Sequence, residues 1–195
     1  MNIITLPLGP LETNCYVVFE NAPGACVLVD PGAQAHSILD CLKERGLTPG
    51  LILLTHAHFD HTGALRELHA QYPDVPIYVS AQDTDETLNM SHGNLVYTDT
   101  FLDGDEISLP PLQFHAISTP GHTKGSSCFV CGNTIFSEGC CGRTDLPGGS
   151  EKQMMASLKR LAELPGDYQV LPGHGPSSTL ERERQTNFYM REAMR

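Results

Sequence analysis

The chain has 195 residues and a formal net charge of -11 at pH 7. This length fits a single domain, residues 1–195, with a substantial hydrophobic core. The acidic balance and scattered basic residues argue against a nucleic-acid-binding protein, because phosphate-backbone binders usually carry a basic stripe. Net charge does not set the local potential of a cleft, so a small-molecule substrate, even an anionic one, is compatible with this composition.

The first twenty residues contain no basic leader, long apolar core or small-residue cleavage site, so we expect no secretory signal. No apolar run reaches the roughly 20 residues that span a bilayer, which argues against a membrane protein. The seven cysteines are odd in number and irregularly spaced, which argues against a disulfide framework. We therefore expect a cytoplasmic protein whose cysteines are mostly small buried apolar residues.

Helical patterns and strand-like runs alternate along the chain. Strands are expected within 14–20, 25–32, 51–56, 76–80, 113–121, 126–130, 134–138 and 168–175. The spacing of apolar residues predicts helices at 36–45, 62–71, 81–90 and 151–163, and the tail from about residue 179 is also expected to be helical. Gly46 is expected to end the first of these helices, and Ser150 to cap the fourth.

Strands that alternate with helices indicate an α/β protein. Hairpin signals in each half, such as the turn at 21–24, argue against a purely parallel sheet. We therefore predict an αββα sandwich of two mixed sheets flanked by helices. Functional residues are then expected on loops at the strand ends.

The segment 53–63 contains the most informative motif, because three histidines and one aspartate follow a buried strand within six positions. The alternation of side chains along a strand places His56 and His58 on one side. Asp60 and His61 lie where the chain turns into a helix, so their side chains can face a second position next to the one that His56 and His58 face. Imidazole and carboxylate groups are good ligands for zinc or iron, and this arrangement can serve two metals.

Two further histidines follow strands in similar loops. His122 lies in Thr-Pro-Gly-His-Thr-Lys-Gly, and His174 lies in Leu-Pro-Gly-His-Gly-Pro. Proline and glycine fix tight turns, so each imidazole is held at a strand exit. The remaining histidines have no such context and are expected to be structural or on the surface: His36, His69, His92 and His115.

The succession His-x-His-x-Asp-His, Pro-Gly-His, Gly-Arg-Thr-Asp-Leu-Pro-Gly-Gly and Pro-Gly-His-Gly resembles the metallo-β-lactamase superfamily. Within it the chain is similar to the small glyoxalase II-like (hydroxyacylglutathione hydrolase-like) hydrolases, over nearly its whole length. The resemblance implies a metal site in the cleft between the sheets, with one metal at His56, His58 and His122 and a second at Asp60, His61 and His174. It implies zinc, as one or two ions, with iron and manganese as alternatives.

The resemblance also assigns roles outside the metal ligands. Asp30 matches an acidic residue that supports the site, and a strand-ending turn residue is the alternative interpretation. Arg143 matches a basic residue for the glutathione carboxylate, and an ion pair with Asp145 is the alternative. Full-length glyoxalase II contacts glutathione largely through an additional C-terminal helical domain, for which this chain has no room.

One expected ligand is missing from the sequence. The family pattern has a Gly-Asp pair whose aspartate bridges the two metals, and this chain has Glu138-Gly139 at that place. Gly132-Asn133 does not replace it, because a Gly-Asn pair between two strands is a hairpin signal. Either Glu138 substitutes for the aspartate, or a short segment has been lost. A mononuclear site at the three histidines is therefore the alternative to a two-metal site.

The expected reaction is hydrolysis of a thioester, such as a hydroxyacylglutathione, through a metal-bound hydroxide that Asp60 orients. No serine nucleophile motif is visible, and Cys140-Cys141 is interpreted as loop packing. Two alternatives stay open. One is an iron-dependent persulfide dioxygenase, which shares the fold and needs one metal. The other is a catalytically impaired binding or regulatory member of the fold.

Overall fold

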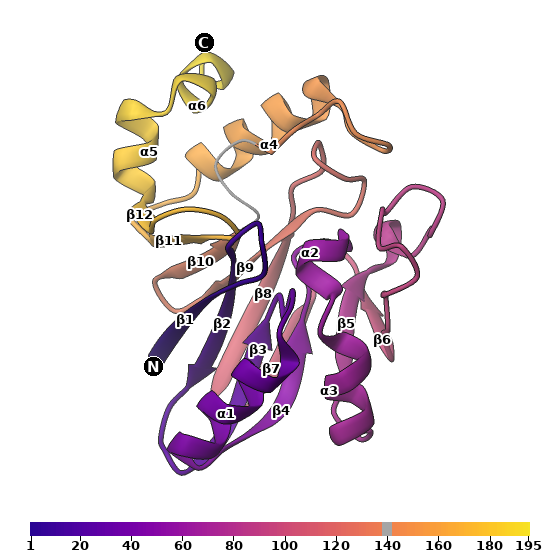
Figure 1. The fold of residues 1–195 in the computed structure, drawn as a ribbon. Coiled ribbons are helices and arrows are strands. Elements are labelled where there is room, and N and C mark those ends of the chain that lie inside the picture. The colour runs from indigo at the N-terminus through magenta and orange to yellow at the C-terminus, as the bar shows by residue number, and fades with distance from the viewer. Residues whose placement is uncertain (138–141) are drawn as a thin grey trace.

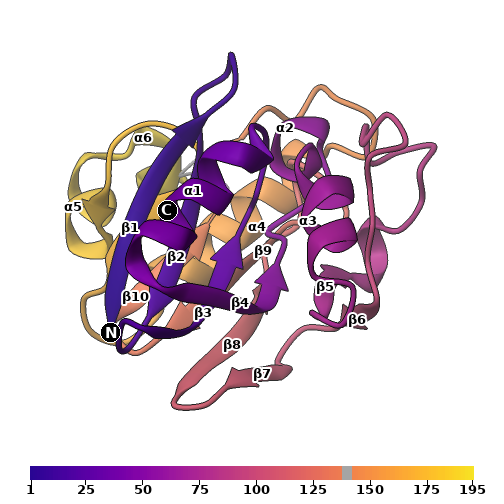
Figure 2. The same cartoon turned by 60° about the horizontal axis from the view of Figure 1, so that its bottom comes forward.

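The computed structural model describes residues 1–137 and 142–195. Two six-stranded sheets pack face to face, as Figures 1 and 2 show from two directions. The first sheet has the order β1 (Asn2–Leu8), β2 (Thr13–Phe19), β3 (Gly24–Val29), β4 (Leu47–Leu53), β5 (Ile77–Ser80), β6 (Asp99–Phe101). The second has the order β12 (Ser178–Thr179), β11 (Gln169–Pro172), β10 (Thr134–Ser137), β9 (Ser127–Cys131), β8 (Leu112–Ser118), β7 (Glu106–Leu109). Both contain parallel and antiparallel pairs, so they are mixed sheets as expected.

The hydrophobic core lies in three layers, and strand β2 shows why. Its side chains alternate between the two faces of the sheet. Cys15 and Val17 pack in the layer beneath the helices of the first sheet, whereas Tyr16 and Val18 pack between the two sheets. The whole strand is therefore apolar or buried, which is why it could be recognised from sequence.

The helices cover the two outer faces of the sandwich (Figure 1). Helices α1 (Ala35–Arg45), α2 (Phe59–Thr62) and α3 (Leu65–Gln71) belong to the first half of the chain, and α4 (Glu151–Ala162), α5 (Leu180–Thr186) and α6 (Phe188–Ala193) to the second. Gly46 ends α1 in the left-handed conformation, and the Ser150 side chain caps α4. The predicted αββα fold is confirmed. Among the described residues, no helix is both long and apolar enough to cross a membrane.

The predicted helix at 81–90 is wrong. The structure has only a short 3-10 helix, η1 (Ala81–Asp83), followed by an irregular segment. Polar side chains here bond to the nearby backbone: Ser80 accepts from Gln82 N, and Asp85 accepts from Thr87 N. Such local bonds compete with helix formation.

Other differences concern weak or interrupted elements. Strands β1, β6, β7 and β12 were not predicted, because they lie at or near the sheet edges and are short or largely exposed. The predicted helix at 62–71 is interrupted after α2 and resumes as α3. The helical tail breaks at Asn187, whose side chain caps α6 by accepting from Tyr189 N and Met190 N.

The strand directions bring the histidine loops together. Strands β3 and β4 are parallel, so the residues after them, Asp30 and His56, lie at the same edge of the first sheet. Strands β10 and β11 are parallel, and β8 runs the same way because both β8 and β10 are antiparallel to β9. The loops with His122 and His174 therefore leave the second sheet at one edge, facing the loops of the first.

Candidate metal centre

The first ligand group consists of His56, His58 and His122, which we call the three-histidine group. One nitrogen atom from each side chain can be chosen so that all lie within 4.8 Å of one another. Nδ1 of His58 and Nε2 of His122 are 2.9 Å apart. Four-coordinate zinc with bonds of about 2.05 Å would separate its nitrogen ligands by roughly 3.3 Å, so small side-chain adjustments suffice.

The outer nitrogen atoms of two of these imidazoles are bonded to the protein. Nδ1 of His122 lies 2.7 Å from the carbonyl oxygen of Arg143, to which it donates. Nδ1 of His56 lies 3.1 Å from Oγ1 of Thr55, which itself donates to Oδ2 of Asp30. In both imidazoles the hydrogen bond at Nδ1 favours the tautomer that carries its proton there. Nε2 of His122 and Nε2 of His56 therefore keep a lone pair for a metal.

Burial keeps this group uncharged in the absence of a metal. It lowers the pKa of His56 well below its ordinary value and that of His58 to about 4, and neighbouring imidazoles add to both effects. Burial also lowers the pKa of His122. Neutral imidazoles are the form that binds metals.

The second ligand group consists of Asp60, His61 and His174, which we call the carboxylate group. Oδ2 of Asp60 lies 3.1 Å from Nε2 of His174 and 3.5 Å from Nε2 of His61. Nδ1 of His174 lies 3.2 Å from the Leu11 carbonyl oxygen, which leaves Nε2 for a metal. Burial by itself would raise the pKa of Asp60, but bonds from His174 and Thr13 and the nearby His61 lower it well below its usual range. The contact with Asp60 raises the pKa of His174.

Asp30 connects the two groups from behind. Its Oδ2 lies 3.0 Å from Nδ1 of His61 and accepts from Thr55 Oγ1, and its Oδ1 accepts from Thr55 N. A Cβ atom at Gly32 would lie 1.7 Å from the carbonyl oxygen of Asp60, so only glycine permits this turn to approach the ligand helix α2. Asp30 is thus a strand-ending residue that also contacts the site.

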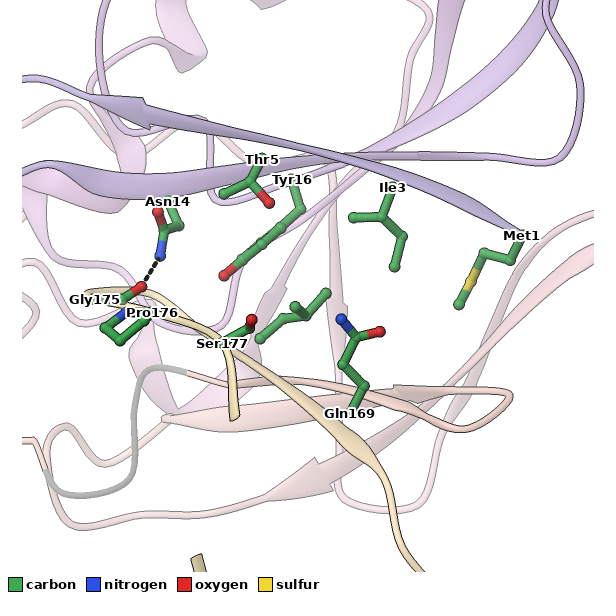
Figure 3. Close-up of a pocket in the computed structure, with 10 residues that line it drawn as sticks. Met1, Ile3, Thr5, Asn14, Tyr16, Gln169, Gly175, Pro176 and Ser177 are labelled. Atoms are coloured by element: carbon green, nitrogen blue, oxygen red, sulfur yellow. Dashed lines mark hydrogen bonds between the residues drawn. The ribbon is translucent and has the colours of Figure 1, made fainter. Parts of the chain in front are cut away.

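The loop of His174 is held by residues that the sequence did not reveal as part of the site. The side-chain amide of Asn14 donates to the carbonyl oxygens of Pro172 and Gly175, both at 2.9 Å. The hydroxyl of Tyr16 donates to Pro172 O at 2.6 Å. Figure 3 shows Asn14 and Tyr16 beside a cavity of about 550 Å³ behind this loop. A polar residue at the start of an otherwise apolar strand is the signal that could have identified Asn14.

Both ligand groups open into one cavity of about 360 Å³. Besides the six ligand side chains, it is lined by Leu11, Phe59, Met90, Gly142, Arg143 and Leu146. The Arg143 guanidinium lies in this lining but forms a two-point ion pair with Asp145, at 2.9 and 2.8 Å. The structure therefore has the ion pair that was the alternative interpretation. The expected replacement ligand Glu138, like Cys140-Cys141, lies outside the described residues.

Comparison with known proteins agrees with this geometry. The model of the metallo-beta-lactamase superfamily matches residues 8–174. The chain belongs to this superfamily. A probable metallo-hydrolase, YqgX of Bacillus subtilis, is 36% identical over an alignment of 205 positions, gaps included, which covers 95% of each chain. The hydroxyacylglutathione hydrolase of Pectobacterium atrosepticum is 37% identical over 180 residues, which cover 89% of this chain and 66% of that protein.

Several solved structures are similar to this chain over almost its whole length. The BLEG-1 B3 metallo-beta-lactamase has a TM-score of 0.88 and 30% identity, covering 97% of this chain and 99% of that one. TTHA1623 in a di-iron-bound form has a TM-score of 0.78 and 36% identity, covering 95% and 99%. ETHE1 from Myxococcus xanthus has a TM-score of 0.82 and 27% identity, covering 100% and 88%. The expected family is thus confirmed at the level of a metallo-hydrolase superfamily.

The side chains of both groups fit a metal ion. Five imidazoles and a carboxylate converge on one cavity, and no carboxylate compensates the three-histidine group directly among the described residues. Nε2 of His58 is buried and has no hydrogen-bond partner in the described part of the chain. This donor set is compatible with zinc, iron or manganese.

Proposed function

We propose that this chain is a thioesterase of the metallo-β-lactamase fold that hydrolyses a compact acyl thioester such as a hydroxyacylglutathione. The observation that carries the proposal is the single cavity in which both ligand groups meet an apolar rim and one arginine. The similarity to a hydroxyacylglutathione hydrolase over 89% of the chain supports it. A metal bound here would lower the pKa of water and polarise the substrate carbonyl.

The protein side chains would orient the reacting groups. Asp60 stays anionic because its pKa is lowered, and Thr13 Oγ1 donates to its Oδ2 at 3.0 Å. A fixed carboxylate oxygen at the cavity wall can accept a hydrogen bond from the attacking water and hold it facing the carbonyl carbon. Such orientation matters because a misplacement of about 1 Å can cost on the order of 100-fold in rate.

The cavity wall offers apolar surface to a compact acyl group next to a polar carrier. Leu11 and Phe59 are exposed by 52% and 39% although both are large and apolar. Together with Met90 and Leu146 they form an apolar rim around the ligand side chains. Exposed apolar clusters at a cleft are typical of binding surfaces.

The carrier of the acyl group would extend past Arg143. A neighbouring cavity of about 450 Å³ is lined by residues that include Gly142 and Arg143, which the two cavities share. The Arg143–Asp145 ion pair is exposed, and exposed ion pairs contribute little to stability, so the guanidinium can exchange Asp145 for a substrate carboxylate. The proposed partner is therefore a small-molecule thioester. We propose neither a nucleic acid nor a membrane as a partner.

Two other functions remain candidates. The three-histidine group is complete without a bridging carboxylate, which favours a one-metal, iron-dependent persulfide dioxygenase. The chain has Glu138-Gly139 where the family pattern has the Gly-Asp pair with the bridging aspartate, which favours a catalytically impaired binding or regulatory protein.

Metal content and turnover decide among the three functions. The protein would be purified without added metal, analysed by mass spectrometry, and assayed with S-D-lactoylglutathione beside Asp60→Asn and the exposed control Asp85→Asn. Thioester hydrolysis that Asp60→Asn abolishes and Asp85→Asn retains supports the thioesterase. Bound iron with oxygen consumption on a persulfide supports the dioxygenase, and no turnover by metal-loaded protein supports the binding role.

A further inference from the structure

A buried carboxylate that is not a metal ligand lies between the two loops of the three-histidine group. Asp83 ends η1, and only 3% of its surface is exposed. Its Oδ2 accepts from Ala57 N and from Thr123 Oγ1, both at 2.9 Å. Its Oδ1 accepts from Gly125 N at 3.0 Å. One side chain thus bonds to both loops at once.

The positions of these donors relate them to the metal ligands. Ala57 separates His56 from His58, and Thr123 follows His122 directly. The two loops are far apart in sequence and come from different sheets. The backbones also meet where Ser127 N donates to Thr55 O at 2.9 Å, at the base of the loops. Asp83 adds the connection next to the histidines.

The packing around Asp83 leaves little freedom. A Cβ atom at Gly125 would lie 2.6 Å from Cβ of Asp83, so only glycine allows the loop to approach this closely. On the other side, the Asn89 side-chain amide donates to the Asp83 carbonyl oxygen at 2.8 Å. The carboxylate is therefore fixed from its own segment as well as from the loops that it joins.

The charge of Asp83 also acts on the site. Burial raises the pKa of Asp83, while the bonds from Ala57, Thr123 and Gly125 favour its ionised form. Its electrostatic attraction favours positive charge on His122. The same attraction favours a cation bound by that imidazole, and the three histidines themselves bring no negative charge.

We propose that Asp83 is a positioning residue, which holds the loops of His56–His58 and of His122 at the separation that one metal ion requires. The inference concerns metal binding by this chain and does not depend on the substrate being a thioester. Partners beyond the direct ligands typically change metal affinity by about 10–100-fold when they are removed.

The test compares Asp83→Asn with Asp85→Asn, an exposed aspartate two residues away. Asparagine keeps the shape of the side chain but replaces one carboxylate oxygen with an NH2 group. That group cannot accept a hydrogen bond from the donors in the loops. Each metal-free protein would be titrated with zinc against a chromophoric chelator, and the visible spectrum of its cobalt form recorded. We expect the tighter metal to bind about 10–100-fold more weakly to Asp83→Asn, with an altered cobalt spectrum, and unchanged binding to Asp85→Asn.

A purely structural role would give a different result. It would lower the unfolding temperature of metal-free Asp83→Asn and leave the metal affinity of the folded protein unchanged, which would overturn the proposal. If Asp83→Asn does not fold, Thr123→Val and Thr123→Ser replace it. The valine removes one donor to Asp83, and the serine keeps the hydroxyl. Weaker binding by the valine variant alone supports the proposal, and equal affinity in both contradicts it.

Discussion

The two ligand groups share one cavity but are built in opposite ways. In the three-histidine group His56 and His58 are buried and His122 is half-buried, and burial lowers the pKa of each imidazole. The carboxylate group is more open, since the His174 side chain is 45% exposed. There Asp60 is held anionic, and its contact raises the pKa of His174.

This difference predicts unequal metal binding. Buried neutral imidazoles need not lose a proton, so the three-histidine group is ready to bind a cation. The contact with Asp60 favours the protonated form of His174, so a metal there competes with a proton, and the His174 side chain is exposed. Among the residues that the structure describes, the cavity lining holds no carboxylate besides Asp60 to offset repulsion between two cations, so we expect one tight metal at the three histidines and a weaker one at the carboxylate group.

The largest expected effect separates the two groups by mutation. His58→Ala should remove most of the bound metal while the fold stays largely intact. The loss of metal affinity should exceed the about 10–100-fold that is typical when a residue hydrogen-bonded to a ligand is removed. His174→Ala should retain the tight metal. Metal content per chain and circular dichroism would measure this. Unchanged metal content in His58→Ala would contradict the six-ligand site, and two equally tight metals in the unaltered protein would contradict the comparison.

A second effect concerns acid stability of the metal-free protein. Burial lowers the pKa of His58 to about 4, whereas an unfolded histidine titrates near about 6.5. The unfolded state therefore binds more protons between these values, so stability falls as the pH drops from about 6.5 to 4, by about 3 kcal/mol from this residue. Denaturant unfolding at several pH values, compared with His58→Gln, would isolate the contribution. Equal pH dependence in the two proteins would show that His58 is not buried in this way.

A third effect would come from supplying the missing bridge. Inserting a Gly-Asp-containing segment after Ser137 should raise hydrolysis of S-D-lactoylglutathione on the order of 100-fold, because a bridging carboxylate would link the two groups and orient the water. Both proteins would carry the same metal. If the unaltered chain is already as fast, the bridge is dispensable or Glu138 replaces it.

The smallest effect would come from Thr13, whose hydroxyl donates to Asp60. Thr13→Val should weaken only the second, weaker metal, by roughly fivefold, because one hydrogen bond contributes about 1 kcal/mol. The control is Thr5→Val, an exposed threonine on the neighbouring strand. Weakening of the tight metal instead would reverse the assignment of the two groups.

The ligand motif could be predicted because it is local in sequence. His56, His58, Asp60 and His61 follow a buried strand within six positions, and the structure places them in the cavity. His122 and His174 were recognised by their Pro-Gly turns, which fix the chain at strand ends. Apolar strands such as β2 were predicted for the same reason, since both faces of the sheet are covered.

Tertiary structure alone decided which residues hold these ligands and how each group is charged. Asp83 lies 26 positions from Ala57 and 42 from Gly125, so no local pattern reveals that it joins their loops. A helix was predicted at 81–90 because helix propensity depends only on residues that are close in sequence. The buried carboxylate of Asp83 instead bonds to backbone that is distant in sequence. The pKa differences between the two groups likewise arise from burial and from contacts between sheets. Sequence determined which side chains are candidate ligands, and packing determined the environment that separates a neutral group from a charged one.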